Sequence, residues 1–275
     1  MEWGLPSREI DRRICGLVDR ARGAYGLVEG GDGAMACRRL GLHLTNGPLP
    51  ADTDGLLSGD HIILNDRVTW GPRREFTVFH EITHHLLDED GELIEYLTDT
   101  YRTDATSYRR ELERICNVGA AEFLMPRARV YEAIAEEGFS IGLVERTAKR
   151  HGVSVVAAAQ QLALCAPRDS YVILAVDAAA ASVPNPGIGL CIEYVFASPD
   201  TRYPLKRFRE LESDHLLVVA WERQRRVSGP AYIPFSSGNR KDCYGEAQPL
   251  HSRVVGFLGN HRPHGKGQLA LPLFN

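Results

Sequence analysis

The chain has 275 residues, of which 44% are hydrophobic and 25% are charged, and its formal net charge is -4 at pH 7. These values are typical of a globular protein with a sizeable core, and the length suggests about two domains. The acidic balance argues against general nucleic-acid binding, which usually requires an excess of Lys and Arg. There is no apolar run of membrane-spanning length, no signal-like start and no C-x-x-C pair, so we expect a cytoplasmic protein with free thiols.

The first half of the chain is predicted to be mainly helical. Apolar residues recur at helical spacing over 7–22, and a second helix is expected over 74–87, after the Gly-Pro pair at 71–72. Between them we expect a loop at 46–55 and a short strand at 61–65 (HIILN), and after them an acidic break at 88–92. Further helices are predicted at 107–124, 128–137, 141–152 and 155–165; Ser140 and Ser154 precede the last two as caps.

The composition changes after Pro167. Four apolar, partly β-branched runs follow: SYVILAV (170–176), GLCIEYVFA (189–197), HLLVVAWE (215–222) and RVVGFLG (253–259). Clusters of Pro, Gly, Asp and Asn separate them, as expected for a second domain that contains a sheet. The residues from 260 onward are expected to end in a short strand or a loosely held tail.

The helix predicted at 74–87 carries an H-E-x-x-H motif, His80-Glu81-Ile82-Thr83-His84. Residues i and i+4 lie on one face of a helix, so both imidazoles can reach one metal ion, and Glu81 can take a proton from a bound water. The alternative is a pair of core histidines bonded to the backbone. His85 lies about 100° around the helix from His84, so we expect it to be exposed or substrate-facing.

A catalytic zinc site needs a third protein ligand and an open position. No further histidine follows at short spacing, so an acidic residue of a later helix is expected; the candidates are Glu95, Asp99, Glu111, Glu113 and Glu122. Glu113 begins a helical face of small residues suited to close packing, and Asn117 lies one turn on as a hydrogen-bonding partner behind the metal. Glu111 points about 200° away from Glu113, so only one of them can face the metal.

The other candidates are expected to play no part in the site. Glu95 and Asp99 are predicted to lie in a solvated acidic loop. Cys116 could approach a metal, but a buried, inert thiol is the favoured interpretation.

The two blocks REFTVFHEITHHLL (74–87) and ERICNVGAAEFLMP (113–126) resemble the ImmA/IrrE family of metallopeptidases. The C-N-V-G-A-A form is similar to the IrrE branch, the radiation-response regulators of Deinococcus. Cys116 stands where the family usually has Ala, and Gly119 where it commonly has Phe. The resemblance implies that His80, His84 and Glu113 hold a metal ion, zinc with manganese as the alternative, and that Glu81 is the catalytic base.

The resemblance also implies an α+β organisation in three parts. Residues 1–126 would form a mainly helical zincin-like metallopeptidase domain, 127–166 a helix-turn-helix-like segment, and 168–275 a mixed α/β, GAF-like sensor domain. The implied activity is a site-specific endopeptidase. Its implied substrate is a helix-turn-helix (XRE-type) repressor, whose cleavage releases DNA-damage and radiation-response genes.

Two other functions remain open. Residues 144–163 have helix-turn-helix character, with Ala148 and Gly152 where such a turn needs a small residue and a left-handed backbone, so a DNA-binding regulator is one alternative. Against it, the helix from Ser154 to Cys165 has no Lys or Arg, and only Gln160 and Gln161 could read bases. We therefore expect a packing or substrate-docking element without direct DNA binding. The other alternative is a non-proteolytic metal or ligand sensor, which would tolerate Glu81→Gln.

Overall fold

The computed structural model describes residues 7–179, 189–199, 201, 205, 207–235 and 237–260. The chain divides into two compact units, one of residues 1–126 with 151–153 and the other of residues 127–150 with 154–275. Helices and strands occur in both units, so the predicted α+β class is confirmed. Among the described residues, no helix combines the length and the apolar character that crossing a membrane requires.

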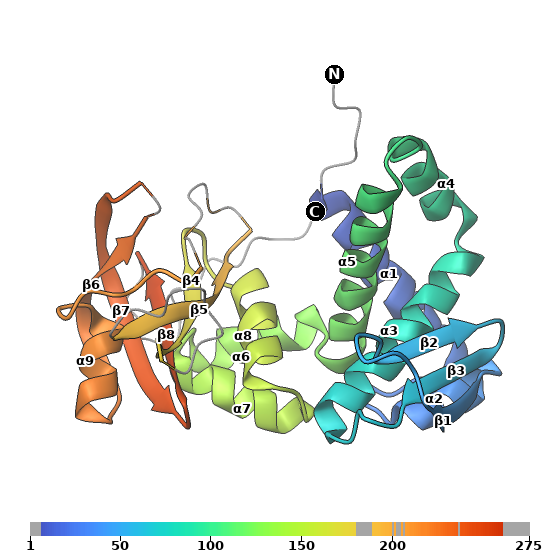
Figure 1. The fold of residues 1–275 in the computed structure, drawn as a ribbon, viewed down its shortest axis with the longest axis horizontal. Helices are drawn as coiled ribbons and strands as arrows, with labels where there is room; N and C mark the ends of the chain where they lie inside the picture. Colours follow the sequence, from blue (N-terminus) through green and yellow to red (C-terminus); the bar gives the residue numbers. More distant parts are fainter. Residues whose placement is uncertain are drawn as a thin grey trace. The chain divides into compact units, whose positions relative to one another are not determined.

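The N-terminal unit combines helices with a small mixed sheet (Figure 1). Strand β3 (His61–Asn65) lies in the middle, parallel to β1 (His43–Gly47) and antiparallel to β2 (Gly55–Ser58), so β2 is an edge strand. The helices are α1 (Ser7–Tyr25), α2 (Gly33–Leu40), α3 (Gly71–Glu89), α4 (Gly91–Thr100) and α5 (Ala105–Leu124).

Helices α3 and α5 pack closely against each other, and their contact positions the site. The rings of Phe79 and Phe123 stack at 5.0 Å between centroids. Gly119 allows a close approach of the two helices, because a Cβ atom there would lie 2.4 Å from Thr83 Cγ2. The predicted close contact at a small residue is therefore found at Gly119.

Helix α4 corrects the predicted acidic loop. Asp90, in the expected break at 88–92, caps α4 by accepting a hydrogen bond from the Leu93 amide. Leu93 and Leu97 are buried one helical turn apart, and packing of this short apolar stripe stabilises the helix. Glu95 and Asp99 are exposed residues of helix α4, so they do not lie in the predicted loop.

The C-terminal unit contains an antiparallel sheet in the order β5-β4-β8-β7-β6. The strands are β4 (Tyr171–Asp177), β5 (Leu190–Ala197), β6 (Val227–Pro234), β7 (Arg240–Leu250) and β8 (Arg253–Gly259). The predicted runs at 170–176, 189–197 and 253–259 match β4, β5 and β8. Strand β6 was not predicted because Pro230 and Pro234 interrupt its pattern, and an edge strand is where a sheet tolerates proline.

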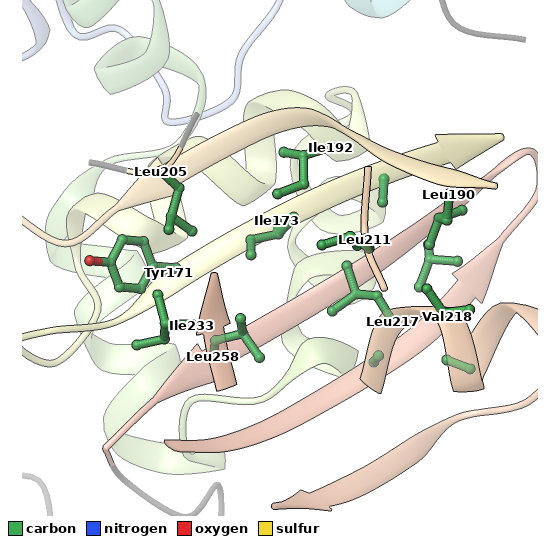
Figure 2. Packing of buried hydrophobic residues seen from close by; sticks show 14 residues of the cluster. Tyr171, Ile173, Leu190, Ile192, Leu205, Leu211, Leu217, Val218, Ile233 and Leu258 are labelled. Carbon is green, nitrogen blue, oxygen red and sulfur yellow. The ribbon is translucent and has the colours of Figure 1, made fainter. Parts of the chain in front are cut away.

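The run HLLVVAWE, expected to be a strand, is helix α9 (Leu216–Arg223). The His215 side chain caps it by accepting a hydrogen bond from the Leu217 amide. Leu217 and Val218 pack against sheet residues such as Ile173 and Leu258 (Figure 2). A continuous apolar run of this length does not separate a buried helix from a buried strand, so the cap and the packing decided the outcome.

Helices α6 (Arg127–Glu137), α7 (Ile141–His151) and α8 (Val155–Leu164) belong with this sheet. Phe139, between α6 and α7, contacts Phe257 at 4.6 Å between ring centroids, and Phe257 pairs with Glu246 across the strands. The buried Glu246 accepts a hydrogen bond of 2.7 Å from the Ile141 amide and also pairs with Arg226.

Ser154 caps α8, as predicted, and Gly152 has the expected left-handed backbone with φ 62°. The tail predicted from 260 lies, beyond Asn260, outside the described residues.

Candidate metal centre

The H-E-x-x-H segment lies in the middle of α3, as predicted. The apolar residues of the helix, among them Phe79 and Ile82, are buried and fix its rotation about its axis. The Nε2 atoms of His80 and His84 lie 3.2 Å apart, and their side chains are 13% and 20% exposed. The two imidazoles therefore converge on one point at the surface of the unit.

Glu113 of α5 lies beside the two histidines. Its Oε2 is 3.1 Å from His80 Nε2 and its Oε1 is 3.6 Å from His84 Nε2. Glu111 is directed elsewhere, since Arg114 binds it with two hydrogen bonds of 2.9 Å and also binds Asp11 of α1. Helical geometry showed only that Glu111 and Glu113 cannot both face the metal. In the structure, Glu113 is the one next to the histidines.

Asn117, one turn after Glu113, determines how His80 presents its ring. The Asn117 Oδ1 atom lies 3.0 Å from His80 Nδ1, so Nδ1 carries the proton and donates to the amide oxygen. The lone pair of Nε2 is then directed toward His84 and Glu113. This is the usual arrangement of a metal-binding histidine held by a second hydrogen bond.

Two imidazole nitrogens and a carboxylate that meet at one point make a set suited to a divalent ion. With Nδ1 donating to Asn117, the Nε2 atom of His80 presents its lone pair to that point. Nitrogen and oxygen donors of this kind are those that catalytic zinc sites use. The residues present therefore fit such an ion.

Glu81 is nearly dry, with a relative exposure of 7%. Burial, and after it the charge of Glu113, raises the pKa of the Glu81 carboxyl to about 7, while a hydrogen bond from the Leu57 amide acts in the opposite direction. Leu57 belongs to the edge strand β2, so the sheet orients this carboxyl from one side and the helix from the other.

A cavity of about 630 Å³ opens in front of these residues. His80, Glu81, His84, Glu113 and Asn117 line it together with Phe76, Thr77, Asp88 and residues 52–57. Gly55 allows strand β2 to approach Glu81, because a Cβ atom there would lie 2.6 Å from Thr77 Cγ2 and 2.9 Å from Glu81 Oε1. The sequence did not point to Gly55 or Leu57 as site residues. They lie in a segment separate from α3, and no residue spacing in the sequence relates the two segments.

Cys116 is buried, as predicted, and burial raises the pKa of its thiol. The less favoured alternative, that this thiol approaches the metal position, also agrees with where it lies. One donor atom from each of His80, His84 and Cys116 lies within 4.8 Å of the other two. The thiol is therefore next to the histidines, and unlike the exposed Glu113 carboxylate it is buried.

The remaining candidates lie elsewhere. His85 is half-buried, its Nε2 lies 3.6 Å from Glu89 Oε1, and it is not among the residues that line the cavity. Glu122 is buried and accepts a hydrogen bond of 3.5 Å from the Cys15 thiol of α1.

Comparisons with known proteins show which family of sequences the chain resembles. Residues 37–163 match the peptidase M78 family, described as the IrrE N-terminal-like domain. The chain is 31% identical over 219 residues to the radiation response metalloprotease IrrE of Deinococcus deserti, with 78% of this chain and 76% of that protein covered. It is 27% identical over 213 residues to the radiation response metalloprotease IrrE of Deinococcus radiodurans, with 74% and 64% covered. A solved Mycobacterium tuberculosis transcriptional regulator has a similar fold, with a TM-score of 0.59, 14% identity and coverage of 91% and 76%.

Proposed function

Because this chain belongs to the family of IrrE N-terminal-like metallopeptidases, we propose that it is a site-specific endopeptidase with His80, His84 and Glu113 as metal ligands and Glu81 as the base. One observation carries the proposal. The Nε2 atoms of both histidines and the Glu113 carboxylate converge within 3.6 Å of one another, and Glu81 lines the same cavity.

The residues of the chain have distinct roles in this mechanism. A divalent ion, when bound, acts as a Lewis acid on the scissile carbonyl and makes water more acidic. Glu81 accepts the proton of the attacking water and returns it to the leaving amine. The Leu57 amide orients the Glu81 carboxyl, and Asn117 holds the His80 ring. The nearly dry position of Glu81 strengthens its hydrogen bond with the Leu57 amide.

We propose zinc as the ion. Two imidazoles and one carboxylate are ligands that zinc accepts in catalytic sites. Manganese is the alternative, because nitrogen and oxygen donors select poorly between these ions.

The proposed substrate is a helix-turn-helix repressor of the XRE type, whose cleavage releases DNA-damage and radiation-response genes. The name of both Deinococcus relatives, radiation response metalloprotease, supports the link to the radiation response, and the repressor is what the family resemblance implies. The helix-turn-helix-like pair α7 and α8 is proposed to dock the substrate and not to read DNA. Gln161, one of its two candidate base readers, is buried, and α8 packs against β4 and β5.

For the sheet of the C-terminal unit, with α9 and α6–α8 against it, we propose a GAF-like sensor role.

The test is a cleavage assay on a purified helix-turn-helix repressor from the same organism, with zinc or manganese added. We expect one discrete cut by the wild type and none by Glu81→Gln. His85→Ala is the matched control, since His85 lies on the same helix outside the cavity lining, and it should cut normally. Cleavage by Glu81→Gln would remove the proposed base. No cleavage by any protein, with repressor binding unaffected by the substitution, would favour a regulator or sensor.

A further inference from the structure

Cys116 is a potential metal donor that the proposed function does not use. It lies on α5 three residues after Glu113, so both side chains are on the face of α5 that meets α3. One donor atom each of Cys116, His80 and His84 falls within a mutual distance of 4.8 Å. Within the part of the chain that the structure describes, His80, His84 and Cys116 are the group of His, Cys, Asp or Glu residues that lies close enough together to hold one metal ion.

Cys116 and Glu113 approach the histidines from different sides. The Glu113 side chain is 52% exposed, whereas Cys116 has a relative exposure of 0%. Glu113 is therefore accessible to solvent, whereas Cys116 lies in the interior of the unit.

The distances allow the sulfur to bind. In a tetrahedral site a zinc-bound sulfur and a zinc-bound imidazole nitrogen are about 3.5 Å apart, given the usual bond lengths. The present separations of at most 4.8 Å would need to shorten by no more than about 1.3 Å, within the reach of a small side-chain and helix adjustment.

We propose that Cys116 is a fourth protein donor, which closes the coordination of the resting enzyme from inside. The inference rests on the proposed function for the other three ligands. Cys116 releases its proton to solvent when its sulfur binds the ion, and takes a proton up again when it leaves. Four protein ligands are the pattern of closed sites, whereas catalysis requires an open position. The peptidase is therefore latent while Cys116 is bound, and the soft sulfur favours zinc over manganese.

The test uses the full chain loaded with cobalt(II) and observed by absorption spectroscopy. The wild type should show a near-ultraviolet sulfur-to-cobalt charge-transfer band besides the visible bands of bound cobalt. Cys116→Ala, which introduces the residue usual in the family, should lose the charge-transfer band and keep the visible ones. Cys37→Ala is the matched control, since Cys37 is also buried in the N-terminal unit but is not part of the His80, His84 and Cys116 cluster. It should retain both sets of bands.

A second measurement compares metal affinities. Cys116→Ala should bind zinc at least about tenfold more weakly, bind manganese almost as well as the wild type, and cleave its substrate faster. Cys116→Ser is the reserve variant if Cys116→Ala fails to fold.

The outcomes separate this inference from the function on which it rests. Visible cobalt bands without a charge-transfer band in the wild type would overturn the role of Cys116 and leave the other ligands in place. The absence of all cobalt bands from the wild type, matching His84→Ala, would overturn the metal centre itself.

Discussion

The hydrogen bond between Asn117 and His80 determines how a proposed ligand is oriented. Because Nδ1 of His80 donates to Asn117 at 3.0 Å, Nε2 is left as the metal-binding atom. The sequence predicted this role for Asn117 from its place one turn after Glu113. It could do so because both residues lie on one helix, where spacing alone defines a face.

We expect Asn117→Ala to weaken zinc binding by about 10- to 100-fold, the usual cost of losing such a partner. The fold should persist, because Asn117 is exposed. Competition with a chromogenic chelator measures the change, and Arg109→Ala, an exposed change on the same helix, is the control. Wild-type affinity in Asn117→Ala would show that His80 is oriented by other contacts.

His215 is a buried histidine whose role the sequence did not reveal, since HLLVVAWE was predicted to be a strand. Its Nε2 donates to the Tyr232 carbonyl at 3.2 Å and its Nδ1 accepts from the Leu217 amide at 3.3 Å. Burial is the main cause that lowers its pKa to about 4, with Arg240 in the same direction, while the Tyr232 carbonyl, Asp214 and Glu212 oppose it. The folded protein therefore holds this imidazole in its neutral form.

This makes the stability of the C-terminal unit depend on pH. Between pH 6.5 and about 4 the unfolded chain binds a proton at His215 and the folded chain does not, so stability falls as the pH is lowered through this window. The difference corresponds to a loss of about 3 kcal/mol. In His215→Asn, which can still cap α9, the slope of unfolding free energy against pH should be smaller. Denaturant melts at pH 4.5 and 7 measure it, and an unchanged slope would assign the effect to other groups.

At the scale of elements, the approach of α5 to α3 determines which side chains meet. Gly119 lies close against Thr83, and the stacked pair Phe79 and Phe123 lies in the same contact. The sequence predicted both helices and a face of small residues. It did not predict that Thr83 packs against Gly119, because that depends on how the two helices are placed against each other.

Gly119→Ala should destabilise the N-terminal unit. The better helix propensity of Ala is worth up to about 1 kcal/mol, but overpacking against Thr83 costs about 1 to 3 kcal/mol. Zinc binding should weaken as well, since a displaced α5 moves Glu113 away from the histidines. Adding Thr83→Ala should restore part of both losses, which a double-mutant cycle by denaturant melts and zinc titration detects. Purely additive effects would contradict a direct contact.

At the scale of the whole molecule, the two units have separate cores. Buried residues such as Ile14, Leu87 and Ile115 form one cluster in the N-terminal unit. The cluster shown in Figure 2 belongs to the C-terminal unit. In the latter, Glu246 joins the sheet to the N-terminus of α7 through the Ile141 amide. The sequence did not anticipate this link, because the two residues are far apart in the chain.

We therefore expect two unfolding transitions that respond to different changes. Zinc at about 1,000 times its dissociation constant should stabilise the N-terminal unit by about 4 kcal/mol and leave the other transition unchanged. Glu246→Ala should lower only the C-terminal transition, by about 2 kcal/mol, because the Ile141 amide loses its acceptor. Glu246→Gln keeps an acceptor and should cost less. Calorimetry with and without zinc measures both, and a single transition that moves with either change would contradict independent units.

The sequence by itself determined what depends on helical pitch. Because residues i and i+4 share a face, it placed His80 and His84 together and Glu81 beside them, and it grouped Asn117 with Glu113. The tertiary structure decided what depends on contacts between separate elements. It brought Glu113 and not Glu111 to the histidines, placed Cys116 behind them, and turned the Leu57 amide toward Glu81. Such contacts follow from how helices and strands pack, and no spacing within one element encodes them.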